Sequence, residues 1–186
     1  LSEIRDIDGK TYVIPNEKDI FQESERKNDI WLVFSLIKSS RSKLLIEKAT
    51  ELGVSRIFAV LSIRSNIKKF NLEKARLISI QAAEQSGRLS LPQFDYYNSF
   101  KALFSEWPPN RPFIWGSTEL NSFESRDFSN VGGLLVGPEG GFSSEETKLF
   151  LSTPNSKPVS MGELTLRSET AAISMLTIWN SKNKAW

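Results

Sequence analysis

Short apolar segments alternate with segments of helical period along most of this chain, and that alternation limits the folds that it can adopt. The apolar segments predict strands, which we place at residues 30–34, 57–61, 112–115, 133–136 and 158–161. The segments of helical period predict helices at residues 43–52, 72–85 and 100–107, after Ser143, and near the C-terminus. Strands that alternate with helices form a mainly parallel sheet with helices on both faces. The expected fold class is therefore α/β.

Local signals mark the ends of the predicted helices. Gly53 and Gly87 directly follow the first two of them, and glycine commonly ends a helix. Ser143 and Glu146 have the spacing of a capping box, which opens a helix. Apolar side chains at helical spacing predict the inward faces: Leu45, Ala49 and Leu52; Leu72, Ala75, Ile78 and Ala82; and Ala172, Leu176 and Trp179.

The N-terminal residues predict a small separate unit. Residues 1–15 carry apolar positions on either side of Asp8-Gly9, a pair typical of a tight β-hairpin turn. A single hairpin is barely stable alone, and the sequence begins with Leu. We therefore expect residues 1–28 to be the end of a longer N-terminal domain plus a polar linker at residues 16–28. Residues 29–186 then form a second domain.

The chain contains no cysteine and no histidine, which excludes several kinds of site. Disulfides, Cys–His nucleophile pairs, Ser–His–Asp triads and zinc sites made of thiolates or imidazoles are ruled out. An enzyme of this composition works with carboxylates, Arg, Lys, hydroxyls and backbone groups, and we expect no metal. No apolar run approaches the roughly 18 residues of a membrane helix, and the first residues do not resemble a signal peptide. We expect a cytoplasmic protein without a membrane partner.

Basic residues are concentrated in one segment, although the net charge is only +2. Residues 38–76 contain ten basic and three acidic residues, so this segment carries +7 and the remainder of the chain −5. Such segregation is typical of proteins that bind the phosphates of nucleic acids. A solvated basic helical face would give the same count, so charge alone leaves both interpretations open.

The segment at residues 133–143 is the most informative one. An apolar strand runs directly into Gly137-Pro138-Glu139-Gly140-Gly141 and then into a capped helix. Glycine lets a backbone approach a ligand closely, and ligands of open α/β sheets bind beyond the carboxyl ends of strands. The segment lacks the Gly-Lys-Ser/Thr of a phosphate-binding P-loop and the G-x-G-x-x-G spacing of dinucleotide folds. It is either a ligand loop or a tight turn that binds nothing.

Two other segments gather polar side chains at helix ends. Residues 161–171 join a short strand, a glycine bend and a helix N-terminus. Residues 82–88 surround a helix C-terminus, where the helix dipole favours a cation such as Arg88. An ion pair with a cap in the first segment, and simple capping in the second, would explain both without a function. The side chains that could carry chemistry are Glu84, Gln85, Arg88, Arg167, Glu169 and Thr170.

Four segments, taken together, resemble the bacterial 16S rRNA uridine-N3 methyltransferases (the ribosomal RNA small subunit methyltransferase E family), which belong to the SPOUT class of S-adenosylmethionine enzymes. The resemblance extends from about residue 30 to the C-terminus. Two positions differ from the family pattern, with Met161 where Leu is usual and Thr165 where a branched aliphatic residue is usual. In chain order, the segments are residues 48–54, 82–88, 136–142 and 161–171.

This resemblance implies a SPOUT-type α/β fold with a C-terminal trefoil knot, and a homodimer with the cofactor site at the knot and next to the partner subunit. It also implies an N-terminal PUA-like RNA-binding domain, of which residues 1–14 would be the last hairpin. The implied methyl donor is S-adenosylmethionine, and the implied substrate is small-subunit ribosomal RNA. By resemblance, the residues that bind the donor are Thr118, Glu119, Val136, Gly137, Pro138, Glu139, Gly140, Gly141, Met161, Gly162, Leu164, Leu166, Thr170 and Ala171.

The acceptor atom narrows the choice of catalytic residues. Methylation at uridine C5 in the well-known enzymes uses a cysteine, which this chain lacks. Attack by N3 requires loss of a weakly acidic N–H and stabilisation of the resulting anion, which a cation near the uracil oxygens supplies. Arg88 and Arg167 are the candidate cations, with Glu84, Gln85 and Glu169 as orienting or proton-accepting partners.

The basic segment at residues 38–76 then becomes a candidate RNA-binding surface, with Arg64, Lys68 and Lys69 at phosphates. Two other functions stay open at this point. One is a different SPOUT reaction, such as ribose 2′-O methylation of rRNA or tRNA. The other is a non-catalytic RNA-binding or ribosome-assembly module.

Overall fold

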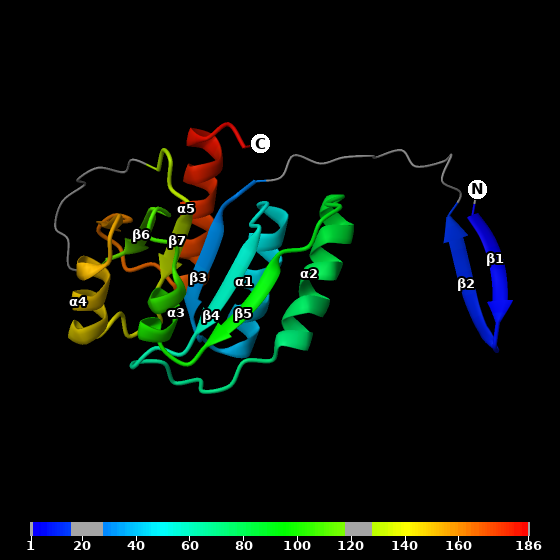
Figure 1. Cartoon of the computed structure of the whole chain (residues 1–186), viewed down its shortest axis with the longest axis horizontal. Coiled ribbons are helices and arrows are strands. Elements are labelled where there is room, and N and C mark those ends of the chain that lie inside the picture. Colours follow the sequence, from blue (N-terminus) through cyan, green and yellow to red (C-terminus); the bar gives the residue numbers. More distant parts are fainter. Residues whose placement is uncertain (1, 16–27, 118–127, 186) are drawn as a thin grey trace.

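A computed structural model describes residues 2–15, 28–117 and 128–185 of the chain (Figure 1). The predicted linker falls almost wholly on residues 16–27, outside this part. Two of the candidate donor-binding residues, Thr118 and Glu119, also lie outside the described residues.

The N-terminal strands form a hairpin of their own. β1 (Ser2–Ile7) and β2 (Lys10–Pro15) pair with each other in antiparallel register, and neither belongs to the larger sheet. Asp8 and Gly9 form the turn, both at positive φ. The predicted hairpin is therefore confirmed. Its assignment to an N-terminal PUA-like domain, and the domain division at residue 28, stay predictions.

Six parallel strands form the larger sheet, in the order β5-β4-β3-β7-β6-β8. The predicted mainly parallel α/β sheet is confirmed. Short apolar strands suit this arrangement, because a strand between two layers of helices is buried on both faces. The strands are β3 (Trp31–Ser35), β4 (Arg56–Val60), β5 (Gln93–Tyr97), β6 (Phe113–Gly116), β7 (Gly133–Val136) and β8 (Ser156–Val159).

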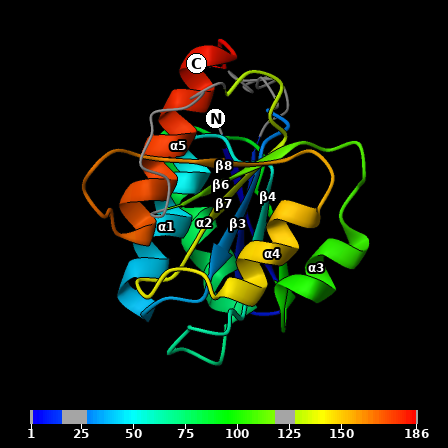
Figure 2. The same cartoon turned by 90° about the vertical axis from the view of Figure 1, so that its left-hand side faces the viewer.

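Helices cover both faces of this sheet (Figure 2). α1 (Ser39–Glu51), α2 (Leu72–Ser86) and α5 (Ser168–Lys182) pack on one face, and α3 (Phe100–Glu106) and α4 (Ser144–Ser152) on the other. The central strand β3 separates the two cores, since Leu32 and Phe34 point into the first and Val33 into the second.

Aromatic rings dominate the second core and reach the loop that follows β7. Phe150 of α4 contacts Phe100 of α3 with ring centroids 5.0 Å apart, and Phe142 with centroids 4.8 Å apart. Edge-to-face pairs of this kind are favourable beyond the area that they bury. Phe142 therefore anchors the C-terminal side of the glycine segment in the core.

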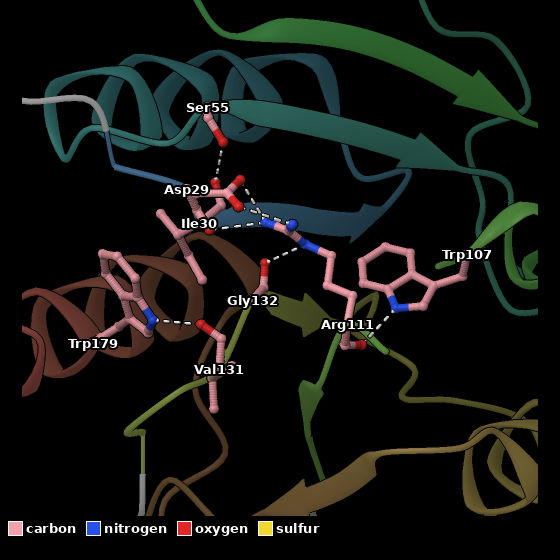
Figure 3. A network of polar contacts seen from close by, with 8 residues as sticks. All are labelled: Asp29, Ile30, Ser55, Trp107, Arg111, Val131, Gly132 and Trp179. Atoms are coloured by element: carbon pink, nitrogen blue, oxygen red, sulfur yellow. Dashed lines mark hydrogen bonds and ion pairs between the residues drawn. The ribbon is translucent and has the colours of Figure 1, made fainter. Parts of the chain in front are cut away.

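At the edge of the sheet where the strands begin, the Arg111 side chain donates hydrogen bonds to Asp29, before β3, and to the Gly132 carbonyl, before β7 (Figure 3). Its guanidinium lies 3.6 Å from the centroid of the Trp31 ring and donates to both carboxylate oxygens of Asp29. The Arg111 hydrogen bonds hold the pKa of Asp29 below its ordinary value. Trp107 Nε1 donates to the Arg111 carbonyl, so backbone and side chain of Arg111 are both fixed.

The helix ends agree with the sequence signals in most places. Gly87 ends α2 in the left-handed region, and Ser143 and Glu146 form the predicted capping box of α4. α1 begins at Ser39, four residues earlier than predicted, because its first turn is polar and carries no apolar signal. The prediction that Leu72 faces inward is wrong: it is 42 % exposed in the first turn of α2, and the buried stripe begins one turn later at Ala75.

One strand was missed by the sequence patterns. β5 lies at the edge of the sheet and consists of Gln93-Phe94-Asp95-Tyr96-Tyr97, with no fully buried residue. An edge strand needs no continuous apolar run, so the pattern that identifies central strands does not find it. None of the helices in the described ranges is long and apolar enough to cross a membrane. The trefoil knot stays a prediction.

Candidate functional site

A pocket of about 300 Å³ lies at the edge of the sheet where β6, β7 and β8 end. Three segments line it: residues 115–117 at the end of β6, the glycine loop (residues 137–141) after β7, and the 161–166 loop after β8. Parallel strands bring their carboxyl ends to one edge, which is where open α/β sheets bind ligands. The fold thus joins the two segments that the sequence singled out.

Glycine is required at two places in these loops. Gly141 has φ +68° and closes a turn in which its N–H donates to the Pro138 carbonyl, at 2.9 Å. Gly162 has φ +121°, a conformation that residues with a Cβ rarely adopt. Both loops therefore have backbone shapes that depend on glycine, and neither is a simple continuation of its strand.

Three side chains hold the glycine loop from outside. Arg64 Nη1 donates to the Gly140 carbonyl at 3.0 Å, and Arg41 Nη1 donates to Glu139 Oε1 at 2.6 Å. The Ser168 hydroxyl at the start of α5 donates to the Gly137 carbonyl. The loop is thus fixed by residues from the β4–α2 connection, α1 and α5.

Glu169 is a buried carboxylate beside this site. Only 6 % of the residue is exposed, and its Oε2 has no hydrogen-bond partner among the described residues. Its Oε1 lies 3.8 Å from Arg41 Nε, so Arg41 stands between the carboxylates of Glu139 and Glu169. The first turn of α5 also favours a negative charge through the helix dipole. Sequence reasoning missed Arg41, whose only signal was its place in the basic segment.

Most of the predicted donor-binding residues line one pocket. They are Val136, Gly137, Pro138, Glu139, Gly140, Gly141, Met161, Gly162, Leu164, Leu166 and Ala171. Thr170 does not line the pocket. Trp115, Phe142 and Arg64 do so without having been predicted for the donor, and Arg64 had been assigned to RNA. Arg167 is exposed and does not itself line the pocket, but its sequence neighbours Leu166 and Ser168 both do.

The second group of catalytic candidates lies elsewhere within one chain. Arg88 donates to the carbonyl oxygens of Thr50 and Val54, both at 2.8 Å, just before the start of β4. Glu84 and Gln85 are exposed in the last turn of α2. Strands begin at this edge, whereas the pocket lies where strands end. Within a single chain, Arg88 and Arg167 therefore lie at opposite edges of the sheet, and the catalytic roles of both stay predictions.

Of the three predicted RNA contacts, Arg64 lines this pocket, whereas Lys68 and Lys69 line two other cavities. Lys68 and Lys69 are exposed in the connection between β4 and α2, on the same edge as Arg64.

Burial, together with the hydrogen bond to Glu106, raises the pKa of Tyr97 at the end of β5 to about 12, so its hydroxyl stays protonated. Among the described residues, no cluster of three acidic side chains could hold a metal ion.

Comparisons with known proteins identify the family of this chain. The family model described as "RNA methyltransferase domain" matches residues 24–180. "Ribosomal RNA small subunit methyltransferase E" of Rickettsia conorii is 31% identical over 182 residues, which cover 95% of this chain and 73% of the relative. The protein of the same name from Mesomycoplasma hyopneumoniae is 30% identical over 83% of this chain and 70% of its own length.

Solved structures share the fold. A ribosomal RNA small subunit methyltransferase E from Neisseria gonorrhoeae, bound to S-adenosyl methionine, superposes with a TM-score of 0.78 at 22% identity, over 97% of this chain and 77% of that one. The TrmH/SpoU tRNA modifying enzyme of A. aeolicus superposes with a TM-score of 0.57 at 15% identity, over 87% and 79%. The fold and the position of the pocket define an α/β protein with a ligand-sized pocket beyond the carboxyl ends of its parallel strands. The chain belongs to the RNA methyltransferase domain family.

Proposed function

We propose that this protein transfers a methyl group from S-adenosylmethionine to N3 of a uridine in small-subunit ribosomal RNA. The observation that carries the proposal is the pocket between the glycine loop and the 161–166 loop, in a chain of the RNA methyltransferase family. The names of the relatives support ribosomal RNA as substrate, and the ligand in the Neisseria structure supports the donor.

The residues of the pocket suit this donor. Trp115, Val136, Met161 and Leu166 give it apolar walls, while the two glycine-containing loops offer backbone N–H and C=O groups. Such a mixture fits an adenosine, which has apolar faces and a polar edge. About 300 Å³ is at the lower end of small-molecule sites. The donor would supply a methyl group already activated on a sulfonium sulfur.

Methyl transfer is an in-line displacement in which the sulfur–carbon bond breaks as the nitrogen–carbon bond forms. The protein's part is to hold the uridine ring so that N3, the methyl carbon and sulfur are collinear. Arg167, next to two pocket-lining residues, is the proposed cation: near the uracil oxygens it would lower the pKa of the N3–H and stabilise the anion. Glu169, with its unpartnered Oε2, would orient Arg167 or accept the N3 proton.

Arg88, Glu84 and Gln85 could take part only from a second copy of the chain, since they lie at the opposite edge of the sheet. We propose a homodimer. The 161–166 loop supports it, because Leu164 is 80 % exposed beside the pocket, and burial of such a side chain against a partner would be favourable. A small-subunit ribosomal RNA substrate also implies a cytoplasmic location. In the bound RNA, the phosphates would be contacted by Arg64, Lys68 and Lys69.

Nucleoside mass spectrometry tests the reaction. Small-subunit ribosomal RNA incubated with the protein and S-adenosylmethionine should yield N3-methyluridine. Arg167→Ala should reduce turnover by about a hundredfold or more, with donor affinity nearly unchanged. Lys148→Ala, an exposed cation on α4, is the control. If the product is a 2′-O-methylated nucleoside, the protein catalyses ribose methylation instead. If the protein does not bind S-adenosylmethionine at all, it is a non-catalytic RNA-binding module.

RNA binding has its own test. Changing Arg64, Lys68 and Lys69 to Glu should weaken RNA binding and flatten its dependence on salt, by about one unit of slope for each phosphate that is no longer neutralised. If the salt dependence of RNA binding is unchanged, these three side chains do not neutralise RNA phosphates, and the basic segment is a solvated surface.

A further inference from the structure

A second cavity, of about 540 Å³, opens on the edge of the sheet where β4 and β5 end. The residues after β4, the start of α3 and the first two turns of α4 line it. Neither the methyl donor nor the predicted catalytic residues account for it.

The cavity has an apolar floor and one unsatisfied polar group. Leu61, Phe100 and Leu149 form the floor, and Ile63 stands beside them with 63 % of its surface exposed. Ser62 also lines the cavity, but the residue is only 4 % exposed and its Oγ is buried, without a hydrogen-bond partner among the described residues. A buried hydroxyl without a partner is costly. The apolar floor, rather than this hydroxyl, is therefore the surface that the cavity offers to a ligand.

The opening of the cavity carries both positive and negative side chains, and they differ in whether they are available to a ligand. Lys68 and Lys101 are exposed and bring two cations to the opening. The Glu146 carboxylate is engaged, since it accepts hydrogen bonds from Ile63 N at 2.9 Å and Ser143 N at 2.8 Å. Glu145 is exposed and can accept from a ligand N–H. Flat apolar faces, a polar edge and an adjacent phosphate are the features of a nucleotide.

A short stretch of chain separates the second cavity from the first pocket. Ser62 and Ile63 line the cavity, and the next residue, Arg64, lines the donor pocket and binds the Gly140 carbonyl. We propose that the second cavity binds the base of a nucleotide next to the target uridine, in single-stranded RNA. This inference rests on the proposed function, and it adds a subsite that selects the sequence or shape around the target.

Abasic substitution tests the base-binding role. In a ribosomal RNA fragment that contains the methylated uridine, each flanking nucleotide is replaced in turn by an abasic one, and the dissociation constant is measured by fluorescence anisotropy. One replacement should weaken binding to the wild type by about fivefold or more, which is typical when a stacked base is removed. The others should have little effect.

The Ile63→Ser variant then identifies the cavity as the site. In this variant the sensitive abasic position should cause less than about a twofold further weakening, because Ile63, the exposed part of the apolar surface for the base, is already missing. Leu77→Ser is the matched control, since Leu77 is 62 % exposed on α2, on the other face of the sheet, and should keep the full abasic effect. Lys101→Ala should weaken RNA binding and lower the salt dependence, whereas Lys148→Ala should do neither.

Two results would overturn the subsite. One is an abasic effect of equal size in wild type and Ile63→Ser. The other is a loss of self-association in Ile63→Ser, seen by sedimentation, with RNA affinity unchanged; the cavity would then be an interface between copies of the chain. In both cases the wild type still methylates uridine and binds S-adenosylmethionine. If the proposed function itself fails, the wild type does neither, so the two failures are distinct.

Discussion

Arg41 Nη1 lies 2.6 Å from Glu139 Oε1, although the two residues are 98 positions apart in the sequence. Through this ion pair the first turn of α1 holds the glycine loop, and the same guanidinium approaches Glu169 in the first turn of α5. One side chain thereby connects the glycine loop with the first turn of α5, next to the proposed donor pocket. Arg41 is therefore expected to position the pocket for its ligand.

Replacement of Arg41 by Met should weaken binding of S-adenosylmethionine about tenfold, which corresponds to roughly 1.4 kcal/mol. The glycine loop loses its ion pair, and Glu169 loses the cation that lies nearest to it. Isothermal titration calorimetry measures the effect. Lys43→Met, an exposed position on the same helix, should bind the donor normally. Equal affinities for the two variants would contradict a positioning role for Arg41.

Gly162→Ala should deform the 161–166 loop. At φ +121° an alanine is strained, and such strain costs about 1–3 kcal/mol. We expect a lower free energy of unfolding in urea and a weaker affinity for the donor. Gly116→Ala is the stability control, because its φ is ordinary and no atom lies within 4 Å of an added Cβ. An unchanged urea midpoint for Gly162→Ala would show that the loop adapts freely.

Arg88→Ala should destabilise the folded chain by about 2 kcal/mol, since hydrogen bonds from a charged group to buried carbonyls contribute about that much. The hydrogen bonds lost include those to the carbonyl oxygens of Thr50 and Val54. Urea unfolding of this variant is compared with that of Arg76→Ala, which removes an exposed cation from α2. If Arg88→Ala unfolds like the wild type yet loses turnover, Arg88 acts in catalysis, and the sites of two chains must meet.

The Asp29–Arg111 pair should make stability depend on pH at the acidic end. Because Arg111 lowers the pKa of Asp29 in the folded chain, the unfolded chain takes up this proton first as the pH falls. The stabilisation is complete above the ordinary value of 3.8 and disappears as the pH drops through the lowered one. Asp29→Asn should therefore destabilise the protein at pH 7 but hardly at pH values well below 3.8.

Urea midpoints at several pH values measure this difference. In an Arg111→Gln background, Asp29→Asn should lose its pH-dependent effect, because the partner that shifts the pKa is absent. A pH-independent effect of Asp29→Asn in the wild-type background would contradict the ion-pair explanation.

The central part of the fold could be predicted because its signals are local. The apolar run at β7, the capping box at Ser143 and the left-handed end at Gly87 each follow from a few adjacent residues. β5 gave no such signal, since an edge strand is stabilised by one neighbour and tolerates Asp95 and Gln93. The exposure of Leu72 depends on where α2 first meets the sheet, which periodicity does not report.

The site could be predicted only in part, for a similar reason. The glycine loop and the 161–166 loop carry unusual sequences, and each could be recognised alone. Arg41 and Arg64 become part of the site only through hydrogen bonds that span 98 and 76 positions of sequence. The separation of Arg88 from Arg167 follows from strand direction: one residue precedes a strand, and the other follows one.

The position of β3 has a consequence for how the protein is made. β3 pairs with β4 soon after it in the sequence, but on its other side Trp31 pairs with Gly133, about a hundred residues further along. Non-local pairing of this kind slows folding, because a long loop must close before the pairing stabilises it. A nascent chain can assemble β3, α1 and β4 early. The glycine loop, carried by β7, reaches its place only when most of the chain has left the ribosome.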